Sequence, residues 1–206
     1  MTESEFNLHN PQPLLIVISG PSGVGKDSVL QAMKTRGLPF HFVVTTTTRT
    51  PRPEEVNGRD YFFVSKEEFA RMIDNGEFFE YAIVYKDYKG NSKKQVHDAL
   101  VCGQDVVMRL DVQGAATVRK LAPEVVLIFL TTQSEKELVD RLKSRKTDTA
   151  EDLSLRIATA QQELKRAVEF DYVIVNADGC LDETVDTVIA IIRAEHHRVH
   201  PRKVSL

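Results

Sequence analysis

The fold is decided by residues 14–33, which read L-L-I-V-I-S-G-P-S-G-V-G-K-D-S-V-L-Q-A-M. They begin with the apolar run Leu14–Ile18, a pattern typical of a strand that is buried on both faces of a parallel sheet. A glycine-rich turn follows, and apolar side chains then recur at helical spacing over Val29–Met33, before the stop signal Arg36-Gly37. Because parallel strands need helical crossovers, this unit of strand, turn and helix predicts an α/β fold.

The turn at residues 20–27, G-P-S-G-V-G-K-D, matches the phosphate-binding pattern G-x-x-x-x-G-K. In such a loop successive backbone N–H groups turn toward one anion, the helix N-terminus adds partial positive charge, and the lysine reaches the outer phosphates. The alternative is a glycine-rich turn that binds nothing. We predict an ATP-binding loop with Lys26 as a catalytic residue, made of Gly20, Pro21, Ser22, Gly23, Val24, Gly25, Lys26, Asp27 and Ser28.

One position departs from this pattern. The residue after Gly-Lys is usually Ser or Thr, whose hydroxyl binds Mg²⁺, but here it is Asp27, followed by Ser28. A carboxylate is a hard oxygen ligand, so Mg²⁺ is expected as the cofactor that accompanies ATP, bound by Asp27 or Ser28. The alternative is that Asp27 turns away and stabilises the first turn of the helix.

The rest of the chain repeats the α/β pattern. Apolar runs predict strands at residues 40–44, 106–110, 125–130 and 172–175, and helices are expected over 134–145, over 149–168 and from Asp182 onward. Between them, residues 45–91 are polar, Pro-broken and then aromatic, and predict a mostly β insertion. A second insertion, 141–152, contains the basic run R-L-K-S-R-K.

Composition limits the class of protein. With 206 residues the chain is expected to form a single domain, and 27 Lys and Arg against 30 Asp and Glu give a net charge of −3. No global field therefore draws it to nucleic acid or to an anionic membrane, and no apolar run is long enough to span one. The first residues lack Lys and Arg, unlike a secretory or transit signal, which favours a cytoplasmic location. Two cysteines, Cys102 and Cys180, predict neither a disulfide framework nor a zinc site.

A second phosphate site is predicted after the second strand, where residues 45–53 read T-T-T-T-R-T-P-R-P. Arg49 and Arg52 are held three apart by a Pro-stiffened turn, and Tyr61 follows. Guanidinium groups bind phosphate oxygens bidentately, so these side chains form a plausible clamp. A basic surface loop with solvated Arg side chains is the alternative.

Six motifs together resemble the guanylate kinase family in order and spacing. Beyond the loop and the T-T-R-T-P-R run, they are E-V-N-G-R-D-Y-F-F-V-S at 55–65, G-E-F-F-E-Y-A at 76–82, L-D-V-Q-G at 110–114 and an R-x-x-x-R pair in the second insertion. The resemblance implies a P-loop core (residues 14–44, 92–140 and 157–197), a GMP-binding insertion (45–91) and a small helical lid (141–156). It also implies transfer of a phosphoryl group from ATP to GMP.

The resemblance assigns roles to residues at the matching positions. Arg49, Arg52 and Tyr61 would bind the GMP phosphate, while Glu80, Asp111 and Thr45 would face the guanine. Guanine presents the donors N1–H and N2–H₂, which a carboxylate complements, and the acceptor O6, which a hydroxyl satisfies. For Glu80 the alternative is a solvated acid beside aromatic neighbours.

In the lid, Arg141 and Arg145 lie four apart on one predicted helix face, and Arg156 follows on the next helix. By resemblance, Arg145 and Arg156 would contact the transferring phosphoryl group as catalytic residues. Arg141 would lie nearer the adenine, together with Asn176. A solvated basic face is the alternative for Arg141 and Lys143.

Two further positions depart from the family. Where the family usually has Tyr-Tyr-Gly-Ser or Tyr-Tyr-Gly-Thr, this chain has Tyr88-Lys89-Gly90-Asn91. Lys89 keeps a donor for the GMP phosphate and adds charge, and the Asn91 amide can donate to O6. These changes put rate and affinity in question more than the identity of the substrate.

Two other classes of function compete with this one. A catalytically inactive, peptide-binding relative should lack loop glycines, Lys26 or the lid arginines, all of which this chain retains. A P-loop kinase for AMP or a nucleoside is disfavoured by Glu80 and Asp111. The oligomeric state is left open. Residues 1–12 and 198–206 are expected to be frayed, and His196, His197 and His200 to be solvated.

Overall fold

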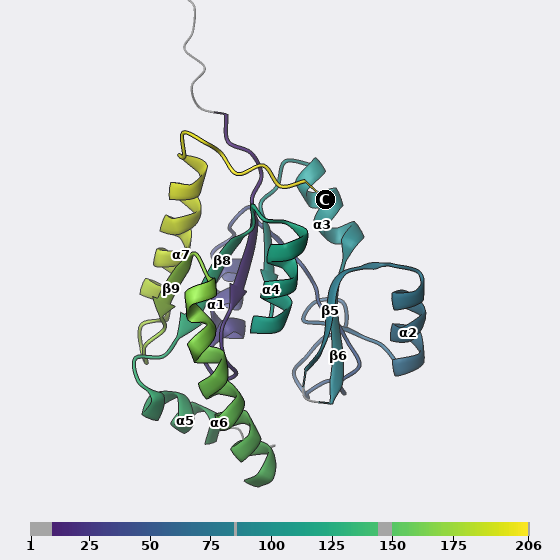
Figure 1. The fold of residues 1–206 in the computed structure, drawn as a ribbon, viewed down its shortest axis with the longest axis vertical. Helices are drawn as coiled ribbons and strands as arrows, with labels where there is room; N and C mark the ends of the chain where they lie inside the picture. Colours follow the sequence, from purple (N-terminus) through teal and green to yellow (C-terminus); the bar gives the residue numbers. More distant parts are fainter. Residues whose placement is uncertain (1–9, 85, 144–149, 206) are drawn as a thin grey trace, which may run out of the picture.

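Strand β1 (Leu15–Ser19) lies at the centre of a five-stranded sheet in the computed structural model, which describes residues 10–84, 86–143 and 150–205 (Figure 1). The order is β2-β7-β1-β8-β9 and the pairings are parallel. The other strands are β2 (His41–Phe42), β7 (Val106–Arg109), β8 (Val126–Thr131) and β9 (Tyr172–Val175). The predicted α/β class, a parallel P-loop-type core with helices on both faces, is confirmed.

Alternate residues of β1 face two layers of helices. Ile16 and Ile18 pack with α1 (Lys26–Thr35) and α7 (Leu181–His196), and α5 (Glu135–Lys143) and α6 (Ala150–Lys165) extend this layer. Leu15 and Val17 pack with α3 (Lys93–Val101) and α4 (Val112–Leu121) on the other face. Since both faces are covered, β1 has no polar side, and its sequence is apolar without alternation.

A second, smaller sheet lies beside this core (Figure 1). Its order is β4-β3-β6-β5, from β3 (Thr46–Thr47), β4 (Phe62–Phe63), β5 (Phe78–Val84) and β6 (Asp87–Ser92). β6 pairs antiparallel with β3 and with β5, and β3 pairs parallel with β4. These strands fall within the segment predicted to be mostly β.

That segment also contains a helix that the aromatic pattern did not predict, α2 (Lys66–Asp74). Ser65 caps it, because the Ser65 hydroxyl accepts a hydrogen bond of 3.1 Å from the backbone N–H of Glu68. Phe69 is fully buried and stacks on Phe78, with ring centroids 4.5 Å apart. The helix therefore covers one face of the small sheet, and the S-x-x-E pattern at Ser65 was the signal for it.

The strand predicted over residues 40–44 is shorter than expected, because β2 ends at Phe42. The side chain of Gln95, on α3, replaces a strand partner at Val44. Its Oε1 accepts from the Val44 N–H at 3.0 Å and its Nε2 donates to the Val44 carbonyl at 3.1 Å. The chain leaves the core sheet at this point and enters the small one. The helix expected over 149–168 likewise ends at Lys165, followed by a 3₁₀ turn at Arg166–Glu169.

The expectation that residues 198–206 are frayed is wrong for the described part of this segment. Arg202 binds the buried carboxylate of Glu195 through Nε at 2.8 Å and Nη2 at 3.1 Å. The Tyr172 hydroxyl donates to the same carboxylate at 2.6 Å, and Val204 packs on the core. A buried charge needs a partner, and the tail supplies it.

His196 is also not solvated as predicted, because its Nε2 lies 2.7 Å from Oδ2 of Asp105. His197 and His200 are exposed. Cys102 and Cys180 are both free thiols. Within the described residues, no helix has the length and apolar character needed to cross a membrane.

Candidate active site

The loop between β1 and α1 depends on glycine at two close approaches. Gly20 and Gly25 have φ values of +136° and +91°, in the region that other residues rarely adopt. A Cβ at Gly20 would lie 2.2 Å from the carbonyl oxygen of Leu130, and one at Gly25 would lie 2.4 Å from Nδ2 of Asn176. Neighbouring elements therefore fix the loop, as an anion-binding backbone requires.

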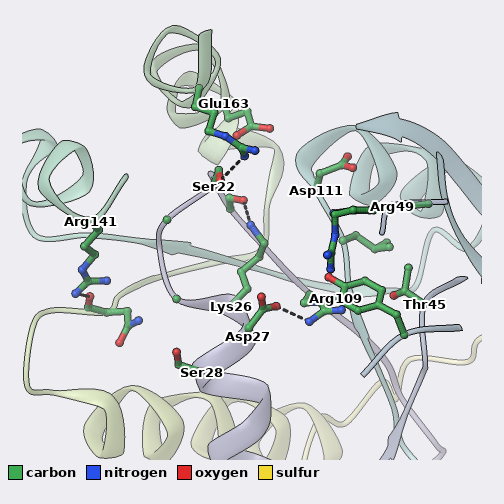
Figure 2. A pocket seen from close by; sticks show the side chains of 18 of the residues that line it. Ser22, Lys26, Asp27, Ser28, Thr45, Arg49, Arg109, Asp111, Arg141 and Glu163 are labelled. Carbon is green, nitrogen blue, oxygen red and sulfur yellow. Dashed lines mark hydrogen bonds and ion pairs between the residues drawn. The ribbon is translucent and has the colours of Figure 1, made fainter. Parts of the chain in front are cut away.

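Lys26 folds back over this loop, and Figure 2 shows it between Ser22 and Asp27. Its Nζ donates to the carbonyl oxygens of Gly20 at 2.5 Å and of Pro21 at 3.0 Å. Burial lowers the pKa of Lys26, and the carboxylates of Glu163, Asp27 and Asp111 oppose the decrease. A phosphate bound in the loop would satisfy this ammonium group in place of the carbonyls.

Asp27, in the first turn of α1, forms an ion pair through Oδ1 with Nη1 of Arg109 (Figure 2). Partial desolvation raises the pKa of Asp27, but the charges of Arg109 and Lys26 outweigh it and the net shift is downward. Arg109 in turn lies over the ring of Tyr61, with its guanidinium carbon 4.5 Å from the ring centroid. The side chain of the neighbouring Ser28 points toward solvent at the same cavity.

The predicted phosphate clamp is organised by a carboxylate, Glu55. Nη2 of Arg49 donates to both oxygens of Glu55, at 2.8 and 2.9 Å, and the Arg52 backbone N–H donates to Oε2 at 2.8 Å. The Arg49 guanidinium also lies 5.3 Å from the ring centroid of Tyr61. The Arg52 side chain is 50% exposed. Arg49 is thus held against Tyr61, while Arg52 extends into the open part of the cavity.

A buried chain of polar groups lies at the far end of the cavity. The Thr45 hydroxyl donates to Oδ1 of Asn91 at 3.0 Å, and Nδ2 of Asn91 donates to Oε1 of Glu80 at 2.7 Å. Glu80 is only 4% exposed. Burial raises its pKa to about 7; the Asn91 hydrogen bond opposes this shift and the nearby Asp111 adds to it. At neutral pH Glu80 is therefore poised between acid and carboxylate.

Asp111 and Lys89, two more of the predicted residues, also line the cavity. Asp111 caps α4, because its Oδ1 accepts from the backbone N–H of Gly114 at 2.9 Å. A Cβ at Gly114 would lie 3.0 Å from Oε2 of Glu80, so glycine lets α4 approach that carboxylate. Burial, together with the cations Arg109 and Lys26, lowers the pKa of Lys89 to about 8.

Arg141 and Asn176 meet on the opposite side of the loop. Nδ2 of Asn176 donates to the Val24 carbonyl at 2.8 Å, and Nη2 of Arg141 donates to the Asn176 carbonyl at 2.9 Å. The Arg141 guanidinium also binds Asp178 and Glu137, at 2.6 and 2.5 Å. These contacts fix Arg141 on the protein surface beside the loop, so the alternative of a freely solvated side chain is wrong.

Helix α6 reaches the loop at Ser22. Nη1 of Arg156 lies 3.5 Å from the Ser22 hydroxyl, and Glu163 of the same helix also lines the cavity. Burial raises the pKa of Glu163, and the charge of Lys26 opposes that rise. Arg145 lies outside the described residues.

A cavity of about 590 Å³ joins these groups. Most of the predicted site residues line it. Two residues of the loop, Pro21 and Val24, do not line the cavity, because both are buried. The charged lining residues that sequence reasoning missed are Asp87, Arg109, Glu163 and Asp178.

Residues 12–195 match the family model for guanylate kinase. The chain belongs to the guanylate kinase family. It is 51% identical over 197 residues to guanylate kinase 2, chloroplastic/mitochondrial, of Oryza sativa subsp. japonica, with 95% of this chain and 69% of the rice protein covered. It is 43% identical to guanylate kinase of Caldanaerobacter subterraneus subsp. tengcongensis, with 93% and 92% covered.

The fold leads to the same family. The crystal structure of guanylate kinase from Anaplasma phagocytophilum superposes with a TM-score of 0.76 at 30% identity, covering 93% of this chain and 90% of that one. The resemblance inferred from the six motifs is confirmed. Like other guanylate kinases, this chain is a nucleoside monophosphate kinase.

Arg109 and Asp178 each had a weak signal in the sequence. Arg109 is a charge at the end of a buried strand, two residues before Asp111, which places it at the carboxyl edge where ligands bind in α/β sheets. Asp178 follows Asn176 after the last strand in the same way. Glu163 had no signal, because only the packing of α6 decides which of its side chains face the loop.

Proposed function

We propose that this guanylate kinase transfers the γ-phosphoryl group of ATP to GMP, giving ADP and GDP, within this cavity. The observation that carries the proposal is the arrangement of its two ends. A glycine loop with Lys26 forms one end, and the buried chain of Thr45, Asn91 and Glu80 forms the other. A triphosphate and a guanine suit these two ends.

ATP is the ligand of the loop end. Backbone N–H groups of residues 22–28, at and before the N-terminus of α1, bind its phosphates, and Lys26 moves from the loop carbonyls to the outer phosphates. The Arg141 guanidinium, held by Asp178, lies beside the place for the adenine, together with Asn176.

GMP is the ligand of the other end. A Glu80 carboxylate accepts hydrogen bonds from the N1–H and N2–H₂ donors of guanine. Thr45 and Asn91 donate hydrogen bonds to O6, and Asp111 lies beside these residues. Arg49, Arg52, Tyr61 and Lys89 bind the monophosphate. Adenine lacks that pair of donors and presents an amino group in place of O6, so the same pocket discriminates against AMP.

Phosphoryl transfer requires mainly positioning and positive charge, because little covalent work is left to the protein. Lys26 and Arg156 supply cations from two sides of the loop. Arg145 is assigned to the same task by family resemblance, and that role stays a prediction.

The residues at the loop fit Mg²⁺. Asp27 and Ser28 offer hard oxygen donors at the cavity, and Mg²⁺ commonly binds one carboxylate together with substrate phosphates and waters. Asp27 has Oδ2 for this purpose, since Oδ1 is paired with Arg109. When bound, the ion neutralises phosphate charge during transfer.

A panel of acceptors tests the proposal. Purified protein with ATP and Mg²⁺ should form ADP rapidly with GMP and slowly with AMP, CMP or UMP, as a coupled assay for ADP measures. ADP formation with another monophosphate but not with GMP would refute the assignment to GMP. Loss of activity on chelation of the metal would support Mg²⁺. The cytoplasmic location stays a prediction, for which cell fractionation is the measurement.

A further inference from the structure

Arg109 is the only charged residue of β7 and ends that strand. It pairs in register with Ile18 of β1, so the sheet holds it beside the start of the phosphate loop. Its side chain is 17% exposed, although its strand neighbours Val106, Val107 and Met108 are fully buried. The end of a central parallel strand is where an α/β sheet presents groups to a ligand.

The guanidinium of Arg109 is fixed from two sides. Asp27 binds Nη1, and the ring of Tyr61 lies 4.5 Å from the guanidinium carbon. Nε and Nη2 have no hydrogen-bond partner among the described residues, and the side chain lines the cavity. An arginine with an anchored edge and vacant donors is preorganised to bind an oxyanion.

The surroundings of Arg109 favour an anion. Lys26 lies in the phosphate-binding loop, and Tyr61 belongs to the predicted phosphate clamp. Arg109 lies between Lys26 and Tyr61. The charges of Arg109 and Lys26 both act on Lys89, so three cations share the middle of the cavity. The carboxylates of Asp27, Asp111 and Glu163 line the same cavity and oppose this positive charge. A phosphate group placed here would relieve the mutual repulsion of the cations.

We propose that Arg109 binds phosphate oxygens of the acceptor monophosphate, between Tyr61 and Lys26, and that Asp27 is the residue that positions Arg109. This inference rests on the proposed function, because it takes the acceptor to be a nucleoside monophosphate. It also accounts for Asp27, which replaces the hydroxyl residue usual at this position of the loop. An unpaired carboxylate there would repel phosphates, whereas a paired one orients a second cation toward them.

Equilibrium binding of GMP and of guanosine, measured by calorimetry without ATP, separates phosphate contacts from base contacts. In Arg109→Ala, GMP should bind about ten- to a hundredfold more weakly, as expected for loss of a hydrogen bond between charged groups, while guanosine binding should be unchanged. Arg109→Lys keeps a cation and should recover part of the affinity for GMP.

A matched control removes a different Arg–Asp pair that involves α1, the helix on which Asp27 lies. Arg36 at the end of α1 pairs with Asp182 and Asp186 on α7, and none of these three residues lines the cavity. Arg36→Ala should bind GMP and guanosine as the wild type does. Equal weakening of GMP and guanosine in Arg109→Ala and Arg109→Lys, or no change in either ligand, would overturn the proposal.

The role of Asp27 is tested by a double-mutant cycle. Asp27→Ser should weaken GMP binding, and Asp27→Ser combined with Arg109→Ala should be no worse than Arg109→Ala alone, because Asp27 acts through Arg109. Additive losses, or tighter GMP binding in Asp27→Ser, would contradict the positioning role. If the wild type bound another monophosphate in place of GMP, the proposed function would fail, and titrations with that monophosphate and its nucleoside would test Arg109.

Discussion

At the scale of single residues, this site uses burial to set the charge of its side chains. Glu80 and Lys89 have pKa values moved toward neutrality, to about 7 and about 8. Both shifts come first from desolvation, which disfavours the charged form of each group. The charges of these two residues, which we propose to bind GMP, are therefore sensitive to pH in the physiological range.

We expect kcat/KM for GMP to follow a bell-shaped pH profile. It should rise as pH increases through about 7, because Glu80 must ionise to accept from guanine, and fall above about 8, as Lys89 loses its charge. Steady-state rates between pH 5.5 and 9.5 measure it. Glu80→Gln should lower the affinity for GMP and remove the acidic limb, and Lys89→Tyr should remove the alkaline limb. A wild-type limb that persists in the matching variant would belong to another group.

Lys26→Met should lower kcat by roughly 10²–10³-fold, because it removes a cation that stabilises charge on the transferring group. Circular dichroism and the thermal unfolding midpoint should show an intact fold. Lys120→Met, at an exposed position of α4, serves as the control and should retain full activity. Near-normal kcat in Lys26→Met would refute the catalytic role.

At the scale of elements, the two sheets are joined where Gln95 pairs with the backbone of Val44. This amide takes the place of a strand partner at the point where the chain leaves β2 for β3. One side chain on α3 thus helps to fix the connection between the core and the small sheet, which carries the residues proposed to bind the base.

Gln95→Leu should lower the free energy of unfolding by about 2 kcal/mol, because it leaves the N–H and carbonyl of Val44 without partners. Urea denaturation followed by circular dichroism measures the change. Gln31→Leu, an exposed glutamine on α1, is the matched control and should change stability little. Equal effects of the two substitutions would show that the Val44 contacts contribute nothing.

The elements also show what sequence can and cannot predict. The loop at residues 20–27 was predictable because its chemistry is local: glycines, a lysine and a helix start are adjacent in the chain. Arg109 was not, because its role comes from the register of β7 on β1, which brings it to Asp27, 82 positions away. Helix α2 was missed because aromatic residues at 61–64 and 78–88 suggested strands throughout, although Ser65 carried a capping signal.

At the scale of the whole molecule, a buried ion pair joins the C-terminal segment to α7. Arg202 in the C-terminal segment binds Glu195 of α7, whose side chain is 1% exposed, and Tyr172 of β9 binds the same carboxylate. Desolvation acts to raise the pKa of Glu195, but the hydrogen bonds from Arg202 and Tyr172 hold it below its ordinary value.

Arg202→Ala should destabilise the protein by about 3–5 kcal/mol, because it leaves a buried carboxylate without its cation. Thermal and urea unfolding at pH 7 measure this loss, which should shrink toward pH 5, where the Glu195 of the variant can take up a proton. Arg198→Ala removes a 48% exposed arginine at 3.5 Å from the same carboxylate and should cost much less. Similar losses in both variants would argue against a special role for Arg202.

The contact between Lys26 and the carbonyls of Gly20 and Pro21 has a practical consequence for enzymology. Before any nucleotide arrives, the loop has already satisfied its lysine internally, and a small tetrahedral anion that draws Lys26 away competes for the same place as ATP. The KM for ATP measured in phosphate or sulfate buffer is then an apparent value, which increases with the concentration of the competing buffer anion. Assays in buffers without such anions would give the intrinsic value.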